Sequence, residues 1–168
     1  KNVAKRHGGD IIDRSINPMN HDPVTSVYNA FFEFMIGCTD FSTTYQHNQK
    51  LLFADKKIIP IPYDFDVSGL INPSYAIGSG EKSEDLGLSS VTERLYRGFK
   101  RDLKIIQQVR EEFLIKKNTI IETVASLKPY FENPKEFLKA KDYILEFYEI
   151  IENNERFANE VTDKLRTK

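Results

Sequence analysis

An apolar repeat with a period near 3.6 residues runs through the second half of the chain and constrains the fold more than any other feature. Residues 105–127 carry it first, and residues 137–151 carry it again after Pro129, which stops a helix. A break is predicted around Lys116-Lys117. Asn133-Pro134 supplies an N-cap followed by proline at the first helical position. Two amphipathic helical stretches are therefore expected here.

Two shorter helices are predicted on either side of these stretches. Ser90-x-x-Glu93 has the pattern of a capping box and predicts a helix over residues 91–101. A last helix is expected to carry Phe157, Val161 and Leu165. Residues 88–166 are thus expected to be almost entirely helical.

The start of the chain predicts one further long helix. Residues 1–9 have the pattern of a helix end closed by Gly8-Gly9, and residues 10–22 are polar and predict a loop. Asp22-Pro23 then supplies an N-cap and a first-turn proline, and apolar residues recur at helical spacing until Gly37. This helix is expected to be largely buried.

Two short apolar runs predict a single β-hairpin. They cover residues 47–53 and 58–65, and no other strand pairing is expected. Pro60 and Pro62 cannot donate to a ladder, which predicts that the second strand lies at an edge. Residues 71–88 are rich in Gly, Ser and Pro and predict a long loop. The fold class indicated is mainly α, within α+β.

Composition limits the classes of partner. A chain of 168 residues with 40% hydrophobic residues can bury one core, which predicts a single domain. The formal charge of −1 provides no electrostatic reason to expect nucleic acid or an anionic membrane. No stretch approaches the roughly 20 apolar residues of a membrane span. The lone Cys38 cannot form an intrachain disulfide, and it is expected to be a small core residue.

The chain begins at Lys1 without methionine, and we expect it to be the C-terminal part of a larger protein. Within one domain, four parts are predicted. They are a lead-in helix end and loop (1–22), a helix plus hairpin that carries the candidate site (23–70), a loop (71–88) and a helical bundle (89–168).

Acidic residues at the end of the second apolar run are the main candidates for chemistry. If the chain is extended there, Asp64 and Asp66 project to the same side. Two such carboxylates repel unless a cation lies between them or one is protonated. Oxygen ligands of this kind suit magnesium or calcium. The hairpin would bring Asn48 close to both, and Asp40 lies on the preceding loop.

This arrangement resembles the catalytic segment of the protein-kinase-like superfamily over residues 37–70. The pair His47-Asn48 and the run Asp64-Phe65-Asp66 look most like the atypical branches, the lipid-kinase-type and the spore-coat CotH-type kinases. The same stretch, with residues 35–37 and 90–98, also resembles a group of bacterial proteins with no assigned activity. The helices would then form a kinase-like C-terminal lobe with one β-hairpin.

The resemblance implies a role for each candidate residue. Asp40 would be the catalytic aspartate that orients the acceptor hydroxyl, Asn48 and Asp64 would bind Mg²⁺, and Asp66 would be an extra ligand in the glycine position. Asp40 and Asn48 are eight residues apart, against about five in typical kinases. A longer loop is therefore expected. The Gly-rich loop and strand lysine that hold ATP are not in this sequence and would lie in the missing N-terminal region.

Other interpretations of these residues stay open. The chain could be a non-catalytic scaffold or binding domain, pseudokinase-like, or a metal-dependent hydrolase that uses water as nucleophile. Asp40 could cap a turn, and Asp64 and Asp66 could protect a strand edge, although their apolar neighbours predict a partly buried turn. The basic group Arg94, Arg97, Lys100 and Arg101 is expected on a solvated helix face, where it could contact phosphate.

Overall fold

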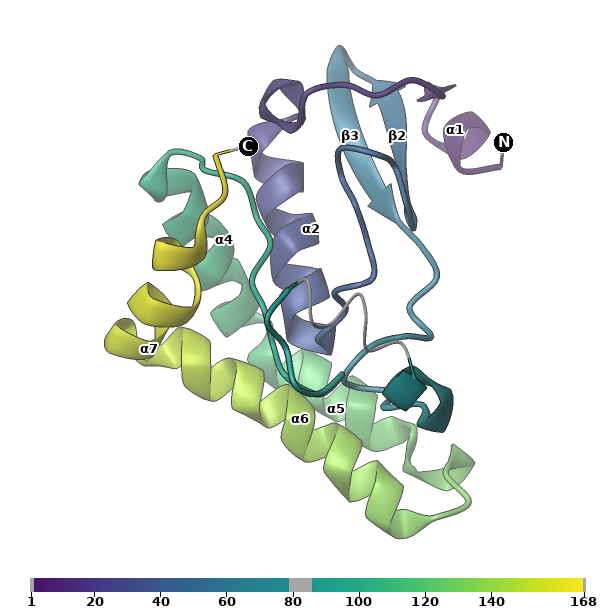
Figure 1. Ribbon diagram of the computed structural model, residues 1–168, viewed down its shortest axis with the longest axis vertical. Helices are drawn as coiled ribbons and strands as arrows, with labels where there is room; N and C mark the ends of the chain where they lie inside the picture. Colours follow the sequence, from purple (N-terminus) through teal and green to yellow (C-terminus); the bar gives the residue numbers. More distant parts are fainter. Residues whose placement is uncertain (1, 79–85, 168) are drawn as a thin grey trace.

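The computed structural model describes residues 2–78 and 86–167, and it shows helices packed beside one small sheet (Figure 1). It is mostly helical, at 51%, with a three-stranded antiparallel sheet, which confirms the α+β class. Residues 79–85 of the expected 71–88 loop lie outside the described residues. The elements are α1 (Asn2–Arg6), β1 (Asp10–Ile12), η1 (Pro18–Asn20), α2 (Pro23–Ile36), β2 (Gln49–Ala54), β3 (Lys57–Pro62), η2 (Ser74–Gly78), α4 (Leu103–Ile115), α5 (Lys117–Ser126), η3 (Lys128–Tyr130), α6 (Pro134–Glu152), α7 (Asn154–Glu160) and η4 (Thr162–Lys164).

Helix α2 lies between the sheet and the other helices, and its ends are determined locally (Figure 1). The Asp22 carboxylate accepts a hydrogen bond from the Thr25 amide at 2.9 Å, and Pro23 occupies the first helical position. Gly37 ends the helix in the left-handed conformation, with φ of 65°. The prediction for this helix is confirmed.

An aromatic cluster joins α2 to the helices behind it. The Phe31 ring meets Tyr96 edge-on, with centroids 5.8 Å apart, and the Phe34 ring meets Phe147 of α6 at 6.0 Å. Phe113 of α4 contacts both Phe31 and Phe147. Edge-to-face pairs of this kind add to the hydrophobic gain from burial. The cluster fixes α2, and with it the loop that follows α2, to the helical bundle.

The predicted hairpin is confirmed and consists of β2 and β3. The two turn residues, Asp55 and Lys56, have φ of 49° and 61°, as in the two-residue turns that match the twist of the strands. Strand β3 lies at the edge of the sheet, as predicted. Residues 59 and 61 alternate with Pro60 and Pro62, so both prolines turn their N–H-free nitrogens to the side of β3 that faces away from β2. The edge therefore offers few donors to an added strand.

The expectation that the hairpin is the only strand pairing was wrong. Strand β1, in the predicted 10–22 loop, pairs antiparallel with β2, with Asp10 opposite Phe53 and Ile12 opposite Leu51. A Cβ on Gly9 would lie 2.3 Å from the Phe53 carbonyl oxygen, so glycine permits the close approach. Three residues are too few to show the alternation by which strands are recognised in a sequence.

The helix predicted over residues 91–101 was also wrong, because this segment is not helical. The residues of the expected capping box form a turn instead, in which the Ser89 amide donates to the Glu93 carboxylate at 3.3 Å and the Thr92 amide donates to the Ser90 hydroxyl at 3.2 Å. The segment then crosses the C-terminal end of α2 (Figure 1).

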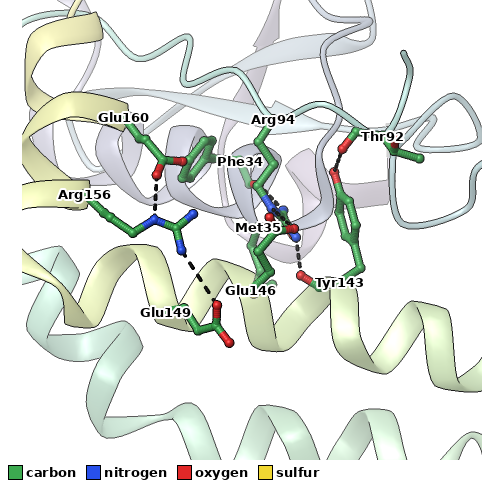
Figure 2. Close-up of polar contacts among 9 residues, drawn as sticks. All are labelled: Phe34, Met35, Thr92, Arg94, Tyr143, Glu146, Glu149, Arg156 and Glu160. Atoms are coloured by element: carbon green, nitrogen blue, oxygen red, sulfur yellow. Dashed lines mark hydrogen bonds and ion pairs between the residues drawn. The ribbon is translucent and has the colours of Figure 1, made fainter.

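Arg94 supplies the physical reason for this extended path. Figure 2 shows its guanidinium aimed at the Phe34 and Met35 carbonyls at the end of α2, with bonds of 2.7 and 2.5 Å, and at the Tyr143 carbonyl of α6. The guanidinium lies 3.6 Å from the centre of the Tyr143 ring, and the side chain is only 4% exposed. The last carbonyls of a helix carry the negative end of the helix dipole, so a buried cation there is strongly favoured.

The expectation of a solvated basic helix face therefore needs correction. Arg94 is buried, and Arg97 is partly buried against backbone carbonyls. Arg101 donates to the Pro18 carbonyl, while Lys100 is exposed. The arginines in this group hold segments of the chain together.

The later helices follow the prediction except at the last one. The chain breaks at Lys116 between α4 and α5, and Asn133 caps α6 by accepting from the Lys135 amide at 3.0 Å. The last helix, α7, contains Phe157 but ends at Glu160, before the expected Val161 and Leu165. The chain after it pairs with residues 98–100, which requires an extended backbone.

Candidate functional site

The site lies where the chain leaves α2 and where it leaves β3. A single antiparallel bridge joins Cys38 to Ser68, and the Gly69 and Leu70 amides donate to the carbonyls of residues 37 and 36, each at 3.0 Å. These bonds hold the segment after β3 along the end of α2. Asp40 follows the first of these two paired segments, and the acidic pair Asp64 and Asp66 precedes the second. The pairing therefore brings the two parts of the candidate site near each other.

Asp40 contacts two of the residues that the sequence grouped with it. Its Oδ1 lies 3.2 Å from His47 Nε2. The Asn48 amide Nδ2 donates to the Asp40 backbone carbonyl at 2.7 Å and to its Oδ2 at 3.3 Å. Asn48 is almost fully buried and has a left-handed φ of 50°, which asparagine tolerates better than most residues. The structure thus brings Asp40, His47 and Asn48 together.

Arg97 holds the backbone on both sides of Asp40. Its Nη1 donates to the Thr39 carbonyl and, at 2.7 Å, to the Phe41 carbonyl, and its guanidinium lies 5.0 Å from the centre of the Phe41 ring. Burial lowers the pKa of Arg97, as expected for a cation removed from water. The sequence interpretation missed this role, because Arg97 is 57 residues from Asp40 and no local pattern connects them.

Asp64 and Asp66 form a hydrogen-bonded pair on the surface. The bond to Asp66 and the charge of Asp66 raise the pKa of Asp64, and Asp40 adds to the effect as a further like charge. Tyr75 donates to Asp66 at 2.8 Å, and this bond lowers the pKa of Asp66. When the pair takes up a proton, Asp64 therefore takes it before Asp66. The Tyr75 contribution also escaped the sequence interpretation.

The expected partly buried turn is confirmed for Phe65 and Val67 and is wrong for the two acids. The Phe65 ring packs against Phe32 of α2, with centroids 5.3 Å apart, while Asp64 and Asp66 on either side are both exposed. Asp64 adopts a left-handed φ of 63°, which turns the chain after β3 so that the two carboxyl groups meet.

Asn48 and the acidic pair are linked through the hairpin. The Tyr63 amide donates to the Asn48 carbonyl at 3.1 Å, so the ladder reaches one residue short of Asp64. Both Asp40 and His47 act electrostatically on Asp64. Among the described residues, no group of three or more His, Cys, Asp or Glu side chains could hold a metal ion. That Asn48, Asp64 and Asp66 share one cation stays a prediction.

A buried acid lies behind the site. Glu33 of α2 is 2% exposed, and burial raises its pKa to about 7, while Cys38 and Arg97 act in the opposite direction. Cys38 is buried as expected, and burial together with Glu33 raises the pKa of its thiol to about 12. The signal for Glu33 in the sequence is a single acid within the run Phe31-Phe32-Glu33-Phe34.

Comparison of the chain with protein-family models, with curated proteins and with solved structures gives no match. The resemblance to the kinase-like superfamily stays a prediction. None of the helices in the described ranges has the length and apolar character that crossing a membrane requires.

Proposed function

We propose that residues 38–70 are the acceptor-orienting and magnesium-binding part of a phosphoryl-transfer site in a kinase-like protein. The direct contact of Asp40 with Asn48, together with the effect of Asp40 on Asp64, carries this proposal. These three residues are the ones to which the resemblance assigns the acceptor and the metal. They come from separate segments, and carboxylates brought together in this way attract a cation or share a proton.

Asp40 would orient the acceptor. Its backbone is held by Arg97 and its carboxylate by Asn48, so the carboxylate can accept a hydrogen bond from an acceptor hydroxyl with little loss of conformational freedom. Positioning of this kind supplies most of the protein's contribution to phosphoryl transfer.

Magnesium would be held by Asn48 and Asp64, with Asp66 as an additional ligand. Asn48 uses its Nδ2 on Asp40, which leaves Oδ1 as a ligand oxygen. Mg²⁺ commonly binds through one or two carboxylates and completes its shell with water and substrate phosphates, so it does not require three acidic side chains. When bound, it would neutralise charge on the transferred phosphate.

A magnesium titration of the 168-residue chain tests the metal site. We expect weak binding, followed by calorimetry, that falls at least about tenfold in Asp64→Asn, because the variant removes one charged ligand. Asp55→Asn is the matched control, since Asp55 is an exposed turn residue in a left-handed conformation that asparagine tolerates. Equal magnesium affinity in all three proteins would contradict the proposed site.

Nucleotide binding tests the kinase assignment separately. The 168 residues contain no Gly-rich phosphate loop, so we expect no ATP turnover by them alone. We expect the residues that bind the nucleotide to lie in an upstream region. With that region present, ATP should bind only with magnesium or manganese, and Asp64→Asn should weaken it. ATP binding that ignores the metal, or that is unchanged by Asp64→Asn, would exclude the kinase assignment.

A non-catalytic binding domain is the second candidate. One observation favours it: the Tyr75 hydroxyl donates to Asp66 and lowers the pKa of that carboxyl group, so Asp66 has a partner within the protein without a metal. In that case magnesium would have no measurable affinity for the chain, while the fold would be unchanged.

A further inference from the structure

A small cavity with a mixed polar and apolar lining lies beneath the loop that carries Asp40. Its volume is about 20 Å³, and its lining includes His21, Asn29 and Arg101 together with Phe41 and Thr43 of the Asp40 loop. A volume of roughly 10–15 Å³ on this measure is enough for one water molecule. The cavity is therefore large enough for one water and too small for an organic ligand.

Three buried polar atoms belong to residues of this lining and have no hydrogen-bond partner among the described residues. They are His21 Nε2, Asn29 Oδ1 and Arg101 Nε. His21 is 3% exposed and Asn29 is 9% exposed. An unpaired polar atom at this depth is costly, so three such atoms on residues that line one cavity indicate a bound group.

The hydrogen-bonding character of each atom follows from its neighbours. Burial lowers the pKa of His21, so the ring is neutral at pH 7, and a ring N–H bonds to the Ile16 backbone. A neutral imidazole that donates from one nitrogen accepts at the other, which makes Nε2 an acceptor. Asn29 Oδ1 is also an acceptor. Arg101 uses its terminal nitrogens on the carbonyls of residues 18 and 100, which leaves Nε–H as a donor.

This pattern selects a neutral molecule. A cation would lie against the Arg101 guanidinium, and an anion would face the two acceptors of His21 and Asn29. Water has two donors and two lone pairs and can serve all three atoms at once. We propose that the cavity binds one internal water molecule, which donates to His21 Nε2 and Asn29 Oδ1 and accepts from Arg101 Nε.

The water would connect three parts of the chain that are distant in sequence. His21 precedes α2, Asn29 lies within α2, and Arg101 lies on the extended segment before α4. Phe41 and Thr43 form part of the same wall, so the loop around Asp40 borders the water as well. This role does not depend on whether the protein transfers phosphate.

A crystal structure of the unaltered chain at high resolution is the first test. One ordered water should lie roughly 2.7–3.2 Å from each of the three atoms, with a B factor similar to that of the surrounding side chains. A cavity without density, or side chains that rotate to bond with one another, would overturn the proposal.

Oxygen-17 relaxation dispersion, which counts long-lived internal waters, tests the site in solution. Asn29→Leu has a similar shape but cannot accept a hydrogen bond, and we expect it to lose the equivalent of one long-lived water per chain. Asn118→Leu, at an exposed position on α5, is the matched control and should lose none. The same signal from the unaltered chain and from Asn29→Leu would refute the site, and the crystal structure decides the question even if Asn29→Leu does not fold.

Discussion

At the scale of single residues, Glu33 departs most from its ordinary behaviour. It is buried beside the Cys38 thiol, and neither carboxylate oxygen has a nitrogen or oxygen partner among the described side chains and backbone. Its pKa is raised from about 4.5 to about 7, mainly by burial. A group whose pKa is raised on folding stabilises the fold fully below its unfolded value. This contribution is lost as pH rises through the folded value.

Glu33→Gln should therefore remove a defined part of the pH dependence of stability. In the unaltered chain the Glu33 contribution falls by about 3 kcal/mol between pH 4.5 and 8, because a pKa unit corresponds to about 1.4 kcal/mol. Urea unfolding across this range should show a flatter profile for Glu33→Gln and higher stability than the unaltered chain at pH 8. The exposed Glu111→Gln should keep the original profile. Parallel profiles for the unaltered chain and Glu33→Gln would disprove the buried acid.

At the scale of elements, the C-terminal end of α2 is the main junction. Arg94 bonds to its last carbonyls, and Tyr143 of α6 covers Gly37 so closely that a Cβ there would lie 2.8 Å from a Tyr143 ring carbon. The Tyr143 hydroxyl also donates to the Thr92 carbonyl at 3.1 Å (Figure 2). One arginine and one tyrosine thus join α2, α6 and the extended segment.

Removal of the Arg94 side chain should destabilise this junction. Arg94→Ala leaves three buried carbonyls without their charged donor, and we expect the free energy of unfolding to fall by about 3 kcal/mol or more. Arg94→Lys should recover only part of the loss, because an ammonium cannot reproduce the planar fork. Arg14→Ala, at an exposed arginine, should change stability by less than about 0.5 kcal/mol. An equally small change in the stability of Arg94→Ala would contradict the stabilising role of Arg94 at the end of α2.

At the scale of the whole molecule, the sheet is contacted by two helices. Helix α2 packs against β3, and Ala4 of α1 packs against Leu52 and Ala54 of β2. The chain after Val161 closes the molecule at another point, where the Arg166 amide donates to the Gly98 carbonyl at 2.9 Å. Both terminal segments therefore contribute to the fold.

Gly9→Ala tests the attachment of the first twelve residues. An added Cβ would meet the Phe53 carbonyl oxygen and the Ala54 side chain, so β1 should move away from β2. Hydrogen exchange should show lost protection in β1, while the β2–β3 pairing stays protected. Gly8→Asn is the control, because position 8 has open space and a left-handed φ of 61° that asparagine tolerates. Unchanged protection of β1 in Gly9→Ala would show that the strand does not depend on this contact.

Several elements could be predicted from the sequence because their signals are local. The start and end of α2, the Asp55-Lys56 turn, the break at Lys116 and the Asn133 cap all depend on bonds or conformations within a few residues. Local patterns of this kind are visible in the chain because the interacting groups are near neighbours in it.

Tertiary structure decided the features in which distant groups compete with local ones. The capping box before residue 91 would favour a helix, but Arg94 gains the carbonyls of α2 only when the segment is extended. Strand β1 forms because it pairs with β2. Arg97 bonds to the backbone of the loop that carries Asp40, more than fifty residues away in the sequence. The sequence predicted that Asn48 lies near Asp64 and Asp66, with Asp40 on the preceding loop. The contact of Asp40 with Asn48 appears only in the tertiary structure, and the exposed pairing of Asp64 with Asp66 depends on Tyr75 and on the pairing of residues 36–38 with 68–70. Buried charge and unpaired carbonyls are costly, so the fold that satisfies them overrides the local preference.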